Sequence, residues 1–325
     1  MLDFRTGQIF GLLMRTLPFL ALRVAVYVGI TLAYVVAVGV GGGMGYLFGG
    51  IGGNAGAGAG WGGLIGFAVV SGVLFWARQY LLYLVKAGHI AVLVELLDGR
   101  EIPGGRSQIE HATASVKEHF ASSSLLFGLN QLVRGVLNAF NRITVSLASW
   151  LPIPGLEALV KLVDAVINTS LSHLDQVILA QILRRGAGAN PWAVARDCTV
   201  LYAQNYKGVL KNAAVLTLLI WALTLLVWVA VGAPIAALIG LFHVHAGVWT
   251  FVLALIAALS LKAALIDPFA TVALIQVYDK LTAGQTPNPE WSAKLDSISA
   301  KFRELGERAR QGATGAAAAL PAPNR

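Results

Sequence analysis

Residues 212–241 read NAAVLTLLIWALTLLVWVAVGAPIAALIGL and contain no acidic or basic side chain. As a helix, this stretch would be about 45 Å long, whereas the hydrocarbon core of a bilayer is about 30 Å thick. Pro234 lies near one end, where a membrane helix tolerates it. The stretch therefore predicts a transmembrane helix and a membrane protein.

The composition of the whole chain points the same way. Of its 325 residues, 57% are hydrophobic and 12% charged, and the mean hydropathy is +0.70, whereas soluble domains are about 25% charged. The net charge of +8 is scattered over short segments rather than gathered on one basic face, so no nucleic-acid partner is expected. A lipid bilayer is the expected surrounding.

Six apolar segments are each long enough to cross a bilayer. They cover residues 18–45, 61–86, 120–150, 156–184, 212–241 and 248–278. Arg5, Arg15 and Arg23 precede or begin the first segment, and no small-x-small cleavage site follows it, so it is interpreted as a retained helix. The expected fold is an all-α bundle of about six transmembrane helices, with amphipathic interfacial helices, in residues 1–285.

Lysine and arginine alternate between the connectors of this bundle. The connectors around 46–60, 151–155 and 242–247 contain none, whereas 87–119, 185–211 and the C-terminal tail carry several. Cytoplasmic loops are enriched in these residues. The pattern therefore predicts that both termini and both basic connectors are cytoplasmic, in a multi-pass protein of a bacterial-type inner membrane.

The C-terminal residues 286–325 change character. Glu290 to Arg310 predicts one charged amphipathic helix, followed by an Ala/Pro-rich disordered tail. The apolar stripe of the helix comprises Trp291, Leu295, Ile298, Phe302 and Leu305. We expect this stripe to rest on the inner membrane face or on the cytoplasmic ends of the bundle, and the tail is a candidate for binding a cytoplasmic partner.

Glycines recur every fourth residue in the first predicted hairpin. They are Gly41, Gly45, Gly49 and Gly53, and then Gly58, Gly62 and Gly66. Small residues four apart share a helix face and allow close helix packing in lipid. The spacing predicts close packing of the first two helices around an outer turn, and the alternative is a hinge or a glycine zipper that forms a homo-oligomer. No strand precedes these glycines, so a phosphate-binding loop is not expected.

Polar residues recur along the third and fourth predicted helices. The first set is Asn130, Arg134, Asn138 and Arg142, and the second is Asp164, Asn168, Ser172 and Gln176. The tight turn at 151–155 makes the two helices antiparallel neighbours, so residues whose numbers share a constant sum can pair, and Asp175 lies within a turn of Arg134. Because an ionised side chain near the bilayer centre costs about 3 kcal/mol, these faces are expected to avoid lipid.

Lys262 and Asp267 add two charges to the last predicted helix. Together with the polar ladder, they are interpreted either as a buried network that fixes helix pairing or as the lining of a water-filled pathway or binding site. With Lys161 nearby, this region has four cations, Arg134, Arg142, Lys161 and Lys262, against three acids, Asp164, Asp175 and Asp267. This positive excess favours an anionic solute or headgroup over a free cation.

Residues that carry catalysis or bind metals are scarce. His243 and His245 could ligate a metal, but no acidic residue or cysteine is adjacent in sequence, so no metal is expected. Cys198 is the only cysteine and has no local activator. No nucleophile elbow, HExxH helix or Walker loop is present, so neither an enzyme nor a cofactor is predicted.

The order of segments from Asn190 to Leu281 resembles the last part of the choline-transporter-like family. That order is an amphipathic elbow that begins at Asn190-Pro191, basic positions at Lys207 and Lys211, a hydrophobic helix, and a final helix with an acid, Asp267. The large outer loop with cysteines found in the eukaryotic members is absent. The resemblance implies movement of choline-like cations or lipid-derived headgroups.

Two functions are therefore expected as alternatives. The first is a transporter or channel-like permease with a polar pathway between the third, fourth and sixth helices. The second is a non-catalytic membrane scaffold or assembly factor whose cytoplasmic segments bind a partner.

Overall fold

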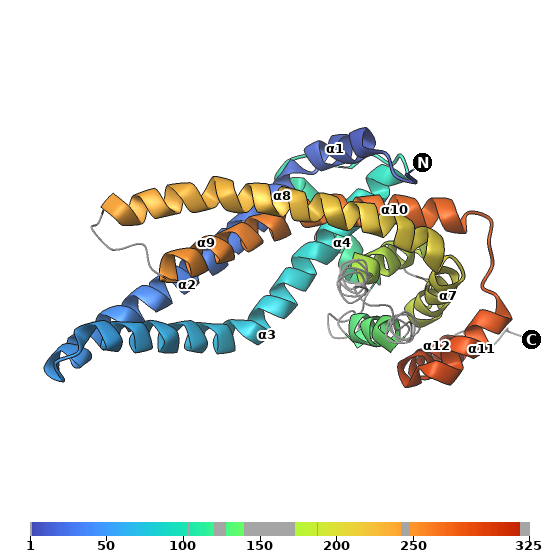
Figure 1. The fold of residues 1–325 in the computed structure, drawn as a ribbon. Helices are drawn as coiled ribbons and strands as arrows, with labels where there is room; N and C mark the ends of the chain where they lie inside the picture. The colour runs from blue at the N-terminus through green and yellow to red at the C-terminus, as the bar shows by residue number, and fades with distance from the viewer. Residues whose placement is uncertain are drawn as a thin grey trace, which may run out of the picture. The chain divides into compact units, whose positions relative to one another are not determined.

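The computed structural model describes residues 2–102, 104–119, 128–139, 173–186, 188–241 and 248–318. All regular structure in these ranges is helical (Figure 1), which confirms the all-α prediction. The helices are α1 (Thr6–Arg15), α2 (Leu17–Ile51), α3 (Ala55–Leu97), α4 (Arg106–His119), α7 (Pro191–Gln204), α8 (Tyr206–Leu241), α9 (Val248–Leu261), the π-helical turn η1 (Lys262–Ile266), α10 (Asp267–Thr282), α11 (Pro289–Ile298) and α12 (Ala300–Ala318), and the ranges 128–139 and 173–185 are also helical.

The chain divides into two compact units. Unit 1 comprises Met1–Thr16, Ala87–Leu219 and Phe269–Arg325, and unit 2 comprises Leu17–Lys86 and Ile220–Pro268. Helices α2 and α9 and the turn η1 lie in unit 2, and α3 and α8 each contribute residues to both units. The units differ in the side chains that they expose.

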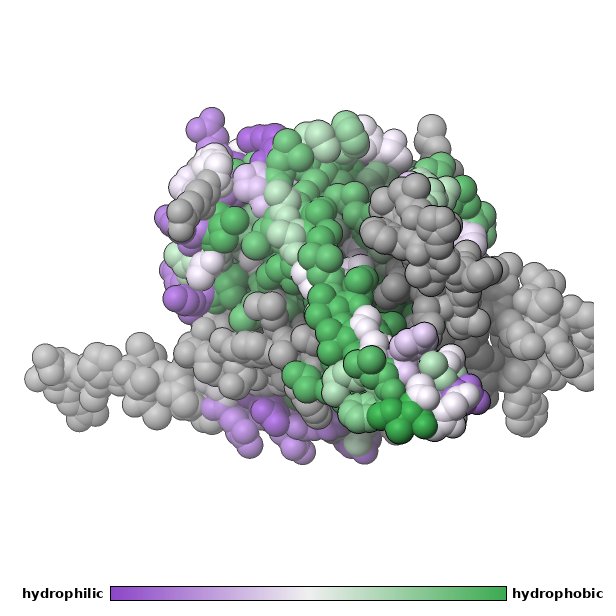
Figure 2. Space-filling view, turned by 90° about the vertical axis from the view of Figure 1, so that its left-hand side faces the viewer, coloured by the Kyte–Doolittle hydropathy of each residue, from purple (hydrophilic) through white to green (hydrophobic). Residues whose placement is uncertain are grey.

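Unit 2 is apolar outside as well as inside. Most of the large hydrophobic side chains that are exposed in the described residues belong to it, including Leu47, Phe48, Ile51, Leu225 and Leu226. Figure 2 shows hydrophobic side chains as a continuous band down the middle of the face turned toward the reader. Exposed apolar patches larger than a few hundred Å² are rare on soluble monomers, so the surface of unit 2 suits lipid.

Four helical stretches in the described residues are long and apolar enough to cross a membrane: Leu17–Ile51, Ala55–Val73, Tyr206–Pro234 and Ala254–Thr282. They overlap four of the six predicted spans. The other two, 120–150 and 156–184, lie largely outside the described residues, and their described parts at 128–139 and 173–184 belong to unit 1. The count of six spans therefore stays a prediction.

The glycine-rich hairpin is formed by α2 and the first half of α3. Six of the seven spaced glycines lie where the two backbones approach: a Cβ built on Gly45 would stand 2.0 Å from the carbonyl oxygen of Gly58, and one on Gly41 would stand 2.3 Å from that of Gly62. Gly53 lies instead in the turn between the helices, with φ +78°. Only glycine allows the helices to come this close.

Unit 1 has a core of its own. Residues from Ala87 to Leu96 at the end of α3 are mostly buried, although the segment 87–119 was expected to be a polar connector. Hydrophobic residues of α10, such as Val272 and Ile275, are also fully buried. Several ion pairs join helices of unit 1, among them Arg134–Asp175, Arg184–Asp279 and Arg196–Asp296.

The C-terminal segment differs from the single helix expected over 290–310. Ser299 has an extended backbone and separates α11 from α12, where its hydroxyl accepts from the Phe302 N–H at 3.2 Å. Helix α12 continues to Ala318, because the alanine-rich sequence has high helix propensity. Leu295, Phe302 and Leu305 are buried, and α11 and α12 both pack against α7.

Helix α7 begins where the sequence predicts. The Asn190 side chain accepts from the N–H groups of Trp192 at 3.0 Å and Ala193 at 3.4 Å, and Pro191 occupies the first turn. The amide of Asn190 also donates to the Ala309 carbonyl of α12 at 2.7 Å. One side chain therefore both caps α7 and holds the C-terminal segment on it.

Candidate functional site

Charged residues are rare in unit 2. The only lysine, arginine and acidic residues in its sequence are Arg23, Arg78, Lys86, Lys262 and Asp267. Three of them are brought together where α2 packs against η1. These three, Arg23, Lys262 and Asp267, are the polar cluster.

The π-helical turn creates the ion pair of the polar cluster. The Asp267 N–H donates to the Lys262 carbonyl, the five-residue spacing that defines a π turn. In an α-helix, residues five apart point about 140° away from each other, but the wider π turn brings them onto one face. The Lys262 ammonium lies 2.8 Å from Oδ1 of Asp267.

Pro268 accounts for the position of this turn. Proline has no N–H, and its ring clashes with the carbonyl four residues earlier, here that of Ala264 within η1. A local π turn relieves such a clash at the expense of regular hydrogen bonding. Single π turns inside α-helices occur frequently at functional sites. The two charged residues that this turn pairs are therefore candidates for a functional site.

Arg23 supplies the second cation of the polar cluster. Its side chain is 1% exposed, and its Nε and Nη1 atoms have no hydrogen-bond partner among the described residues. Asp267 of the facing helix lies close enough to Arg23 for the two charges to attract. Two cations thus share one carboxylate, and the polar cluster carries a net charge of +1.

Hydroxyl groups lie near the polar cluster on the same helices. Thr31 Oγ1 on α2 donates to Ser260 Oγ on α9 at 2.9 Å. Ser260 is two residues before Lys262, and Thr31 is two turns after Arg23. Unit 2 therefore has a polar interior strip between α2 and the α9–η1 helix, within an apolar exterior.

The described part of the predicted ladder lies in unit 1. Arg134 donates from Nε and Nη2 to Asp175 Oδ2 at 3.0 and 2.8 Å, and Gln176 accepts from the Thr271 hydroxyl at 2.8 Å. Arg134 is 48% exposed at its side chain, Asn138 is exposed and Asn130 is buried. Four ladder residues lie outside the described residues: Arg142, Asp164, Asn168 and Ser172.

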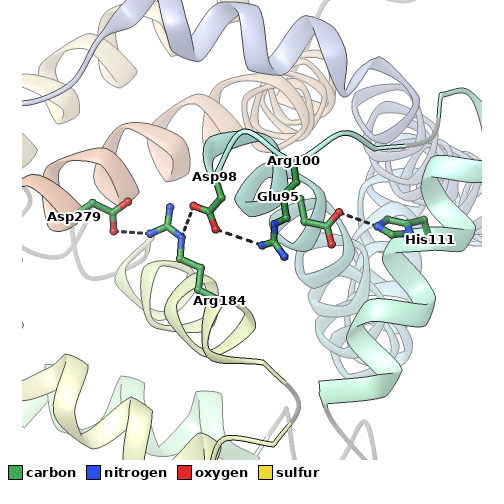
Figure 3. A network of polar contacts seen from close by, with 6 residues as sticks. All are labelled: Glu95, Asp98, Arg100, His111, Arg184 and Asp279. Atoms are coloured by element: carbon green, nitrogen blue, oxygen red, sulfur yellow. Dashed lines mark hydrogen bonds and ion pairs between the residues drawn. The ribbon is translucent and has the colours of Figure 1, made fainter.

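Unit 1 also contains a network of charged residues that the sequence did not indicate (Figure 3). Arg184 pairs with Asp98 at 3.0 Å and with Asp279 at 2.7 Å, joining the end of α3, helix 173–185 and α10. Glu95 pairs with His111 of α4 at 2.8 Å. The Arg184 pairs connect helices that are distant in sequence, whereas the Glu95–His111 pair joins the consecutive helices α3 and α4, and together they link four helices of unit 1.

Cys198 on α7 is buried. Burial raises the pKa of its thiol to about 11, so little thiolate exists near neutral pH. The described residues contain no group of three His, Cys, Asp or Glu that could hold a metal ion.

Sequence reasoning identified Lys262 and Asp267 but treated Arg23 as a charge at the start of the first span. The available signal was its surroundings, because Arg23 stands inside the apolar run LPFLALRVAVYVG at residues 17–29. No protein-family model, characterised protein or solved structure matches the chain. The proposal for its function therefore rests on the polar cluster and on the two units.

Proposed function

We propose that the chain is a membrane permease in which unit 2 spans the bilayer and the polar cluster lines the route of a polar solute. The observation that carries this proposal is the buried, incompletely paired Arg23 in a unit with an apolar exterior. Charged side chains inside membrane segments are costly, and they commonly mark ion or substrate pathways. This proposed route differs from the one expected between the third, fourth and sixth predicted helices, because it lies between the first, α2, and the sixth, α9–η1.

The division into units supports four spans with unit 1 on one side of the membrane. The chain passes between the units after residues 16, 86, 219 and 268. If each stretch of unit 2 crosses the bilayer as a helical pair, all stretches of unit 1 lie on the same side. Unit 1 contains both termini and both basic connectors, so the positive-inside rule places it in the cytoplasm.

The side of the membrane on which Ile153 lies distinguishes a four-span topology from a six-span topology. A cysteine at this position, in a Cys198→Ser background, is extracellular with six spans and cytoplasmic with four. We expect an impermeant thiol reagent to label it in inside-out vesicles and not in sealed cells. Cysteines at Asn54, in the outer turn, and at Ser297, in α11, are the outer and inner controls.

Water access to the polar strip tests the permease. Single cysteines at Thr31, Ser260 and Ala264 line or border the strip, whereas one at Leu226 would face lipid. A permease predicts that an impermeant thiol reagent labels the first three but not Leu226→Cys. Protection of all four in folded protein, together with the absence of solute flux in proteoliposomes, would refute the permease.

The alternative function is a membrane scaffold. It has support from unit 1, where the charge network and the docked C-terminal helices form a compact helical unit. A dry polar strip together with loss of a bound protein on deletion of residues 286–325 would favour this alternative. The apolar stripe of the tail already packs on α7, so such a partner would contact the charged outer face of α11 and α12.

A further inference from the structure

We infer that Arg23 is the principal contact of a binding site for an oxyanion, a carboxylate or phosphate group, within the polar cluster. This inference rests on the proposed permease because it names the solute class that its route would accept. The premises are the burial of Arg23, its two nitrogen atoms without a hydrogen-bond partner among the described residues, and the sharing of Asp267, the one acidic side chain of the polar cluster, with Lys262.

A buried guanidinium needs negative charge nearby. Arginine stays protonated in proteins, and an uncompensated charge in a low-dielectric interior is strongly unfavourable. Among the described residues, Asp267 is the acidic residue whose charge interacts with Arg23, and it already lies 2.8 Å from the Lys262 ammonium. A second anion would therefore balance the net charge of +1.

The chemistry of the donors selects oxygen anions. Guanidinium N–H groups match the geometry of carboxylate and phosphate oxygens better than that of a spherical ion. Nε and Nη1 of Arg23 are both available as donors, and the Lys262 ammonium can contribute charge from the facing helix. A choline-like cation would instead meet two positive side chains and one negative one.

Asp267 competes with the anion for both cations. Its removal should therefore strengthen binding, while loss of Arg23 should weaken it. This opposite response separates a binding site from a purely structural ion cluster, in which both changes would only destabilise the protein.

The test measures binding of inorganic phosphate and of acetate to the full-length protein in nanodiscs, by calorimetry at constant ionic strength with chloride as the reference anion. Arg23→Gln should weaken phosphate binding by about 10- to 100-fold, the effect of losing charge-assisted hydrogen bonds. Arg23→Lys should weaken it less, and Asp267→Asn should strengthen it. Arg15→Gln, on the exposed face of α1, should leave it unchanged.

The lipid composition distinguishes two sources of the anion. If a phospholipid headgroup is the natural occupant, replacing zwitterionic lipid by phosphatidylglycerol should weaken the binding of added phosphate, and Arg23→Gln should abolish this competition. If the occupant is a soluble anion, the affinity should be the same in both lipids. Either result supports the oxyanion site.

Equal affinity in wild type, Arg23→Lys and Asp267→Asn, all folded by thermal unfolding, would overturn the inference. Undetectable phosphate and acetate binding in wild type and Asp267→Asn, in both lipid compositions, would also overturn it. Flux through proteoliposomes is measured separately. Arg23-dependent binding without flux would refute the permease but keep the site, whereas flux of a polar solute without anion binding would refute the site but keep the permease.

Discussion

Replacing Phe302 by alanine tests how the C-terminal helices are held on α7. The Phe302 side chain is 0% exposed, and the Arg196 guanidinium lies 4.8 Å from the centre of its ring. Truncating a fully buried phenylalanine costs about 3–5 kcal/mol. Because about 1.4 kcal/mol changes an equilibrium tenfold, the opening equilibrium of α12 should rise by about 100- to 3000-fold.

Hydrogen exchange, followed by mass spectrometry in nanodiscs, measures this opening directly. Amides of α12 exchange through local opening, so their exchange should accelerate in Phe302→Ala, up to the limit at which the helix is always detached. Amides of α2 should not change. Glu307→Ala is the matched control, since Glu307 is exposed on the same helix. Equal exchange in the two variants would show that burial of Phe302 does not hold α12.

Three further predictions concern other parts of the chain. Gly45→Ala should destabilise the protein by about 1–3 kcal/mol in thermal unfolding, because its Cβ would meet a carbonyl of α3, whereas Gly43→Ala meets nothing and should have little effect. The pKa of Asp3 is lowered by its hydrogen bond to Lys280, so its stabilising effect is present above about pH 4 and is lost as pH falls through the lowered value. Proteolysis of the N-terminus should therefore increase in acid, and Asp3→Asn should remove this pH dependence. Cys198, with its raised pKa, should react with maleimide at pH 8 about 100-fold or more slowly in folded protein than in detergent-unfolded protein.

Local sequence patterns predicted the helices of unit 2 because hydropathy and glycine spacing are read over one or two turns. The four described spanning stretches overlap predicted ones, and the spaced glycines lie where α2 and α3 approach. The helix ends were less predictable. The first predicted span ended at residue 45, but α2 continues to Ile51, since packing between the two glycine faces outweighs the low helix propensity of glycine.

Only two of the three residues of the polar cluster could be predicted from the sequence. The geometry of the cluster depends on contacts between residues that are far apart in sequence. Lys262 and Asp267 stand out as charges in an apolar run, but five-residue spacing gives no reason to pair them in an α-helix. Their pairing requires the π turn next to Pro268. Arg23 joins them through packing of α2 against η1, more than 200 residues away in sequence, and no local pattern contains this information.

The last long helix shows that hydropathy alone does not separate a membrane helix from a buried core helix. Its apolar stretch continues from Ala254 to Thr282, but residues from Phe269 onward belong to unit 1, where α10 is a buried core helix whose Asp279 pairs with Arg184. A core helix and a membrane helix both need apolar side chains, so composition cannot distinguish them. Residues 248–268, as a helix of about 31 Å, already match the thickness of the hydrocarbon core. The polar cluster at 262–267 would then lie near one end of this span, where a charged solute reaches it at a lower desolvation cost than at the bilayer centre.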